Sequence, residues 1–341
     1  MATPHAVGGR AVPGPTPCAT AHATIHEVVT DPYDVHYEVP VAGGGLRVAR
    51  AGLPPDEADG VVLAVHGVTS SLMAWRTVAR ELTGRMRICL LAPDLRGRGQ
   101  SAHLPGPYGF AAHVADLLAV LDHAGVEQAV LAGHSMGAYV AARFAADHPN
   151  RAAATVLVDG GMPYADAPEG DPDVVVETVA APLIERLPLT FASVDAYARR
   201  WAAHPAFAHS WNDDMDAYAR YDVDGPPGAM HCVVSQNAVE IDVREMLFDD
   251  ATRTALDNVR APVHIVRAAR GLQDEEDKPF IPADFLTTFA AMRTDASVEL
   301  VPYANHYTVV LGAGDGPLVV AGAIERALCR TATEDRLQWT A

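Results

Sequence analysis

Short, almost uninterrupted apolar runs recur along the chain, and segments suited to helices lie between them at 74–82, 109–124 and 138–148. Apolar runs without polar alternation are typical of strands that are buried on both faces, as in a parallel sheet covered by helices. The alternation of strand and helix therefore predicts an α/β fold. The predicted buried strands are 61–65, 88–92, 129–132, 155–158, 263–266 and 298–301.

Two further β-like stretches, 35–41 and 46–51, precede these runs, and the glycines at 43–45 separate them. A glycine turn between two such stretches is the pattern of a β-hairpin. We expect the hairpin to form an antiparallel edge of the sheet. The whole sheet is then expected to contain eight strands and to be mostly parallel.

The alternation stops between Val158 and Pro262, where about a hundred residues contain no comparable apolar run. Aromatic residues at helix-like spacings, interrupted by prolines, occupy this segment instead, and we interpret it as an inserted helical cap. The predicted divisions of the chain are a loosely ordered lead-in (1–34), an α/β core (35–159 and 262–330), the helical cap (160–261) and a C-terminal tail (331–341).

Composition and charge narrow the classes of partner. The chain has 341 residues, 49% of them hydrophobic, which is enough for one core with an insertion. Its net charge of −18 opposes binding to nucleic acid or to an anionic membrane surface. No apolar run approaches the roughly 20 residues of a membrane span, and the first residues lack the pattern of a secretory signal. We predict a cytoplasmic protein that neither binds nucleic acid nor inserts into a membrane.

The sequence Gly-His-Ser-Met-Gly at 133–137 lies between a predicted strand and a predicted helix. In such a G-x-S-x-G turn the chain bends so sharply that glycines must flank the serine, which is lifted to the edge of the sheet. The amides and the positive end of the following helix stabilise negative charge there. We therefore predict Ser135 as a nucleophile and the Met136 N–H as an oxyanion donor.

The strand at 61–65 ends in His66-Gly67, upstream of the serine. A glycine at that point allows the backbone to approach a substrate closely. The Val68 N–H is the natural second oxyanion donor. Two such donors would make a complete oxyanion hole.

Four motifs follow predicted strands, and together they resemble the α/β-hydrolase superfamily over about residues 35–328: His66-Gly67, Asp94-Leu-Arg-Gly-Arg-Gly-Gln-Ser101, the turn at 133–137, and Asn305-His306. The resemblance implies the α/β-hydrolase fold. It also implies that His66, Asp94 and the arginines at 96 and 98 brace loops. No metal-ligand spacing such as H-E-x-x-H is present, so we predict neither a metal nor a cofactor.

A serine hydroxyl needs a general base, and His306 follows the last predicted strand, where the resemblance places the base. The acid is open between two residues. Most of the superfamily carries it after the strand that follows the cap, but Asp274 falls three residues later than Gly-x-x-Asp would place it. Asp159 ends the strand after the nucleophile, a position that some members use. We prefer Asp159 and keep Asp274 as the alternative.

The remaining histidines near the motifs are assigned no chemistry. His134 is expected to point away from the serine into the packing of the following helix. His204, His209 and His231 lie in the predicted cap and are interpreted as ordinary polar residues.

These residues predict hydrolysis of an ester or lactone of a small, apolar substrate through an acyl-enzyme at Ser135. Haloalkane dehalogenases and epoxide hydrolases of this superfamily carry aspartate at the nucleophile position, so the serine speaks against both. A carbon–carbon bond hydrolase of diketones, a cofactor-free perhydrolase and a hydrolase-like receptor that only binds its ligand stay open as alternatives. An exposed aromatic cap surface would suit a homodimer as readily as a substrate.

Overall fold

The computed structural model describes residues 1, 31–162, 167–293 and 295–338, so the predicted lead-in lies almost wholly outside the described residues. The core is an eight-stranded sheet with the order β1-β2-β4-β3-β5-β6-β10-β11. These strands are β1 (Val35–Val41), β2 (Gly44–Gly52), β3 (Val61–Val65), β4 (Cys89–Pro93), β5 (Ala129–His134), β6 (Ala152–Val158), β10 (Val263–Ala268) and β11 (Ser297–Val301).

The directions of the strands confirm the predicted sheet. β2 runs antiparallel to β1 and to β4, as expected for a hairpin at the edge. Every other neighbouring pair in this sheet, within the described residues, is parallel. The carboxyl ends of the parallel strands therefore meet at one edge, which is where such sheets carry their ligand sites.

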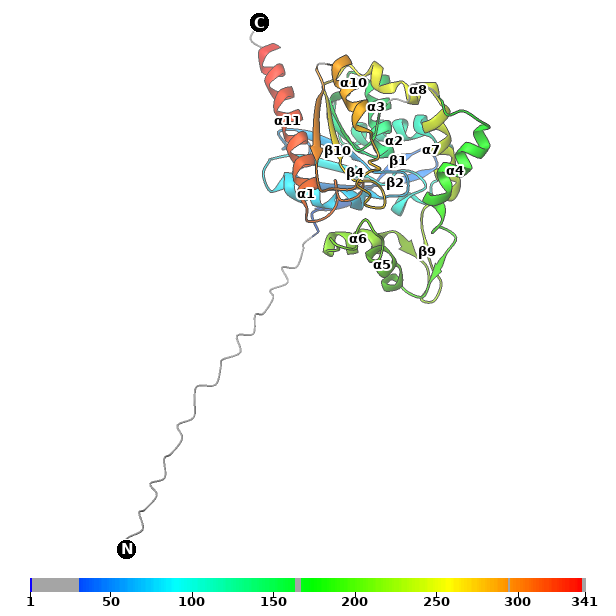
Figure 1. Cartoon of the computed structure of the whole chain (residues 1–341). Coiled ribbons are helices and arrows are strands. Elements are labelled where there is room, and N and C mark those ends of the chain that lie inside the picture. Colours follow the sequence, from blue (N-terminus) through cyan, green and yellow to red (C-terminus); the bar gives the residue numbers. More distant parts are fainter. Residues whose placement is uncertain (2–30, 163–166, 294, 339–341) are drawn as a thin grey trace. The chain divides into compact units, whose positions relative to one another are not determined.

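Both faces of the sheet are buried except at its edge, where β11, predicted as a strand buried on both faces, exposes Val298 and Leu300 because no further strand or helix among the described residues covers them. Val62 and Ala64 of β3 belong to one hydrophobic cluster, whereas Leu63 and Val65 belong to the other, because successive side chains of a strand point to opposite faces. This double burial is the physical origin of the unbroken apolar runs. The helices α1 (Arg76–Thr83) and α11 (Asp315–Gln338) cover the first face, and α2 (Phe110–His123), α3 (Met136–Asp147) and α10 (Ala283–Met292) cover the second (Figure 1).

The last helix, α11, passes through the predicted boundary at residues 330 and 331 and ends at Gln338. Residues 323–338 are rich in Ala, Arg, Glu and Leu, which have high intrinsic helix propensity. The segment predicted as a tail therefore continues the helix. Among the described residues, no helix combines the length and the apolar character needed to cross a bilayer.

Between β6 and β10 the chain forms short helices and a small three-stranded sheet of order β7-β9-β8. The sequence did not predict this sheet, because strands of two or three residues carry no alternation signal. Side chains cap five of the helices at their N-termini: Asp171, Ser193, Asn212, Ser235 and Asp249. The elements of this insertion are α4 (Pro172–Ile184), β7 (Thr190–Phe191), α5 (Val194–Ala202), α6 (Asp213–Tyr221), β8 (Val223–Asp224), β9 (Met230–Cys232), α7 (Gln236–Phe248), α8 (Asp250–Arg253) and α9 (Ala255–Asn258).

Candidate active site

Ser135 occupies the sharp turn between β5 and α3, with φ 55° and ψ −123°. This region of backbone space is unfavourable for a residue with a side chain, and such strain is characteristic of functional sites. The turn closes only with glycines beside it: a Cβ on Gly133 would collide with the Gly137 carbonyl, and one on Gly137 would collide with that of Val65. The close packing of β3, β5 and α3 therefore dictates the glycines of the motif.

His306 and Asp159 are in direct contact. The His306 Nδ1 lies 2.7 Å from Asp159 Oδ2, and the Asp159 side chain is fully buried. The other carboxylate oxygen accepts a hydrogen bond from the Ala268 N–H of β10 at 3.2 Å. A carboxylate at Nδ1 fixes the tautomer in which Nδ1 carries the proton. The Nε2 atom of His306 is then left as an acceptor.

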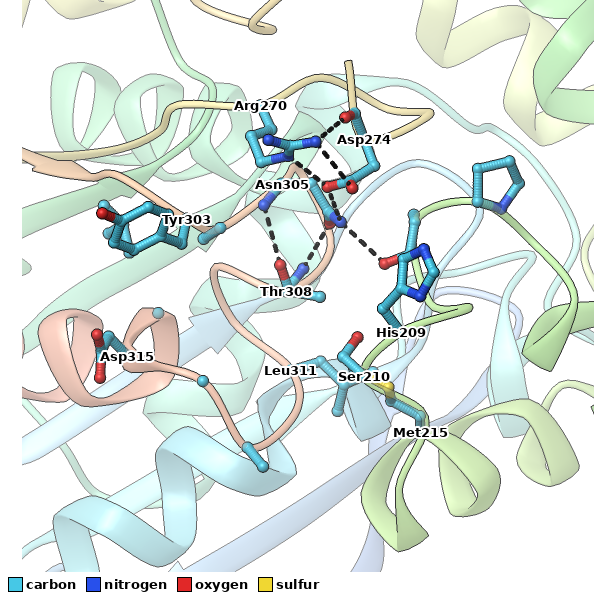
Figure 2. A pocket seen from close by; sticks show the side chains of 17 residues that line it. His209, Ser210, Met215, Arg270, Asp274, Tyr303, Asn305, Thr308, Leu311 and Asp315 are labelled. Carbon is cyan, nitrogen blue, oxygen red and sulfur yellow. Dashed lines mark hydrogen bonds and ion pairs between the residues drawn. The ribbon is translucent and has the colours of Figure 1, made fainter. Parts of the chain in front are cut away.

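Asp274, the alternative acid, has different partners. Its carboxylate accepts hydrogen bonds from Arg270 Nε at 2.8 Å and Asn305 Nδ2 at 3.1 Å (Figure 2). Partial burial raises the pKa of Asp274, but the hydrogen bonds from Arg270 and Asn305 outweigh it and hold that pKa below its ordinary value. The Asp274 carboxylate therefore binds Arg270 and Asn305, whereas the Asp159 carboxylate contacts the His306 ring.

The expectation that His134 points into the helix packing is wrong. Its Nε2 lies 2.7 Å from the backbone carbonyl oxygen of His306, and the centroids of the two rings are 4.8 Å apart. The reason is that β5 extends to His134, two residues beyond the predicted strand, so this side chain projects from the strand end toward the His306 loop. Burial lowers the pKa of His134 well below its ordinary value, and the neutral ring donates from Nε2.

His66 braces the loop that follows β3. Its Nε2 accepts a hydrogen bond from the Leu95 N–H at 2.9 Å, so its Nδ1 carries the proton and donates to the Gly67 carbonyl at 2.8 Å. Burial lowers the pKa of His66 to about 3, which keeps the ring neutral. His66 therefore links this loop to the loop after β4.

Asp94 and Arg96 hold the neighbouring loop through buried contacts. Asp94 accepts hydrogen bonds from the Leu72 N–H at 2.8 Å and the Tyr221 hydroxyl at 2.7 Å, and burial raises its pKa to about 6. Arg96 forms a two-point contact with Asp116, at 2.7 and 2.6 Å. Both side chains connect separate segments, as the resemblance implied.

The Val68 and Met136 N–H groups remain available for an incoming negative charge. Met136 is the first residue of α3, so its N–H has no partner within the helix. Within the described ranges the Val68 N–H donates to no protein acceptor. Both residues line the same cavity as Ser135 and His306. This arrangement can stabilise an oxyanion formed at Ser135.

The cavity has a volume of about 270 Å³, and its walls are mainly apolar. No Asp, Glu, Lys or Arg side chain lines it within the described part of the chain. His204, His209 and His231 of the insertion do not line it either, within the same residues. No group of three or more His, Cys, Asp or Glu among the described residues is arranged to hold a metal ion. The insertion contributes Val179, Pro182, Leu183, Tyr218, Met246 and Leu247 to the walls.

Several known proteins are similar to this chain in sequence or in fold. Residues 60–211 match the family model described as alpha/beta hydrolase fold. A 98-residue segment is 41% identical to Lipase LipV of Mycobacterium tuberculosis, covering 29% of this chain and 36% of that protein. A 123-residue segment is 35% identical to Epoxide hydrolase 2 of Siraitia grosvenorii, covering 36% of this chain and 37% of that protein. The matched segments thus span little more than a third of these relatives.

The solved structure of E-2-(Acetamidomethylene)succinate Hydrolase is similar over 86% of this chain and 98% of its own, with a TM-score of 0.69 and 22% sequence identity. At that identity the likeness concerns the fold. Together with the family model, it confirms the predicted resemblance to the α/β-hydrolase superfamily: the chain has the α/β-hydrolase fold.

Proposed function

We propose that this chain is a serine hydrolase that cleaves the carboxylic ester or lactone of a small, uncharged and largely apolar substrate. The observation that carries the proposal is the 2.7 Å contact between His306 Nδ1 and buried Asp159, beside a cavity that Ser135 also lines. An oriented histidine with a buried carboxylate is what a serine hydroxyl needs to become a nucleophile.

In the proposed mechanism His306 Nε2 accepts the hydroxyl proton of Ser135 as the oxygen attacks the substrate carbonyl. The Val68 and Met136 N–H groups stabilise the oxyanion of the tetrahedral intermediate. The protonated His306 then gives its proton to the leaving alkoxide, and an acyl-enzyme remains. Water, deprotonated by His306, attacks the acyl group, and the acid leaves as Ser135 regains its proton.

The lining of the cavity supports an uncharged substrate. A carboxylate or ammonium group placed against Val179, Leu183 and Leu247 would lose its hydration without gaining a counter-charge. An apolar acyl chain or a lactone ring loses little on entering and gains from burial. The volume of about 270 Å³ favours small molecules of this kind.

The names of the two relatives above imply different activities, and the type of nucleophile distinguishes between these activities. Ser135 occupies the position where the resemblance implies an aspartate in epoxide hydrolases of this superfamily, and a serine suits acyl transfer. We therefore extend to this chain the ester chemistry implied by the lipase's name, and not the epoxide chemistry.

Hydrolysis of short p-nitrophenyl esters and small lactones tests the proposal. Wild type should turn them over, Ser135→Ala should not, and Ser210→Ala, an exposed serine of the insertion, should match wild type. Faster cleavage of a diketone than of every ester would instead identify a carbon–carbon bond hydrolase. Tight ligand binding without turnover would identify a receptor and overturn the proposal.

A further inference from the structure

Arg186 follows α4 in the insertion, and its buried guanidinium contacts the loop that carries the Val68 N–H. Its Nη2 donates to the Thr69 carbonyl at 2.9 Å and pairs with Asp222 Oδ2 at 3.1 Å. Its Nη1 donates to the Leu183 carbonyl at 3.3 Å, and its Nε contacts the Tyr197 hydroxyl at 3.0 Å. One side chain therefore joins the insertion to the core at the edge of the cavity.

Three consecutive carbonyls of this loop are held by donors from three parts of the chain. The Gly67 carbonyl accepts from the Ser70 N–H of the loop itself, at 3.2 Å, and from His66 Nδ1, at 2.8 Å. The Val68 carbonyl accepts from Arg98 Nε of the core, at 2.9 Å. The Thr69 carbonyl accepts from Arg186 of the insertion. Because a peptide group is planar, the Thr69 carbonyl sets the direction of the Ser70 N–H, and the Gly67 carbonyl sets the direction of the Val68 N–H. The Ser70 N–H donates to the Gly67 carbonyl and so links these two peptide groups.

Both arginines are buried and paired with buried carboxylates. The Arg98 Nη2 lies 2.5 Å from Asp242, and neither side chain is exposed. Arg186 pairs with Asp222, which the Tyr197 hydroxyl also contacts. Hydrogen bonds from a charged donor are stronger and more directional than those from a neutral donor. The two guanidinium groups are thus suited to hold the loop in one conformation.

Arg186 also connects the loop to the wall of the cavity. The carbonyl of Leu183 accepts its hydrogen bond, and the side chain of Leu183 lines the cavity beside Ser135. The same guanidinium therefore contacts both the last turn of α4 and the loop that carries the Val68 N–H.

We propose that Arg186 is a positioning residue for the oxyanion hole. It fixes the Thr69–Ser70 peptide, whose N–H holds the Gly67 carbonyl and thereby the Val68 N–H, and so makes the rate depend on the insertion. This inference rests on the proposed serine hydrolase function. Arg186 does not line the cavity within the described residues, so its effect reaches the substrate only through the loop.

Kinetics of Arg186→Lys test this role. A lysine ammonium keeps the positive charge near Asp222 but does not reach all four acceptors of the guanidinium, because it lacks the planar fork. We expect kcat to fall roughly 10- to 100-fold, as for a misplaced oxyanion donor, with KM within about two-fold. Affinity for a trifluoromethyl ketone, which forms an oxyanion in the hole, should fall by the same factor as kcat/KM.

The matched control is Arg200→Gln, which removes an exposed arginine of α5 that lies 3.6 Å from Glu185. It should keep wild-type kinetics. Arg186→Gln is a second variant, which removes the charge of Arg186 and leaves Asp222 without a counter-charge. If Arg186→Gln fails to fold, the double variant Arg186→Gln/Asp222→Asn takes its place. A purely structural Arg186 would lower the melting temperature but leave the kcat and ketone affinity of the folded protein within about two-fold of wild type, which would overturn the proposal.

Hydrogen exchange separates a failure of this inference from a failure of the proposed function. The Ser70 N–H donates to the Gly67 carbonyl within the loop at 3.2 Å, and the Leu72 N–H donates to the Asp94 carboxylate at 2.8 Å. They should exchange faster in Arg186→Lys than in wild type or Arg200→Gln, whether or not the protein hydrolyses esters. If wild type is inactive but exchange follows this pattern, the proposed hydrolase function is refuted and the role of Arg186 in fixing the loop stands. An active wild type without it refutes the role of Arg186 alone.

Discussion

Replacing Asp159 by asparagine changes one functional contact while keeping the size of the side chain. Asp159 Oδ2 accepts from His306 Nδ1, and Oδ1 accepts from the Ala268 N–H. In Asp159→Asn the amide oxygen is expected to stay on the Ala268 N–H, so the NH₂ group faces Nδ1. Nδ1 must then accept, and the proton moves to Nε2. His306 in that tautomer is unable to take the proton of Ser135.

The size of the effect follows from the loss of the correct tautomer. For a buried aspartate in this role the rate falls about 10⁴-fold on conversion to asparagine. This corresponds to about 5.4 kcal/mol of transition-state stabilisation. Asp159 does not line the cavity within the described residues, so KM should change little.

The assay is steady-state hydrolysis of a p-nitrophenyl ester by Asp159→Asn and by Asp274→Asn. The second variant should stay within about ten-fold of wild type, because losing a partly exposed contact to Arg270 and Asn305 costs about 1 kcal/mol. Thermal unfolding of both variants checks that they are folded. A loss at Asp274 larger than that at Asp159 would refute the assignment of the acid.

Three further predictions concern residues around the site. His134→Phe, which removes the hydrogen bond to the His306 carbonyl, should lower kcat by roughly five-fold, since such a bond is worth about 1 kcal/mol; an unchanged kcat would contradict the positioning role. Gly160→Ala should destabilise the fold by about 1–3 kcal/mol in urea unfolding, because its Cβ would collide with the Ser135 carbonyl; wild-type stability would contradict this. Because the folded pKa of His66 is about 3, below the ordinary 6.5, its stabilisation is complete above pH 6.5 and is lost as the pH falls toward 3. The difference in unfolding free energy between wild type and His66→Gln should therefore shrink by up to about 1.4 kcal/mol per pH unit below pH 6.5. A difference independent of pH would contradict the burial argument.

Local signals in the sequence predicted the sheet and the nucleophile turn. Double burial leaves unbroken apolar runs in the parallel strands, and the close approach of β3, β5 and α3 forces glycines at 133 and 137. These constraints act within a few residues of each strand end, so one chain displays them. No such local signal identifies the catalytic acid. Its identity depends on β6 lying beside β10 in the sheet and on the path of the loop that carries Asp274.

Contacts between distant segments explain what sequence reasoning missed. His134 meets the carbonyl of a residue 172 positions away, and Arg186 meets one 117 positions away. No local sequence motif predicts either contact. The sequence does not distinguish a buried arginine from an exposed one, because only the folding of the insertion brings its partner, here Asp222, into contact with it.

Covalent capture of Ser135 by a fluorophosphonate tests the central claim most directly. The intact mass of the native protein should rise by one phosphonyl group, and peptide mapping should place the group on Ser135. Ser135→Ala and the unfolded protein should stay unlabelled, whereas Ser210→Ala, at an exposed serine, should label as wild type does. Labelling of another residue, or ester hydrolysis that persists in Ser135→Ala, would contradict the assignment of Ser135 as the nucleophile.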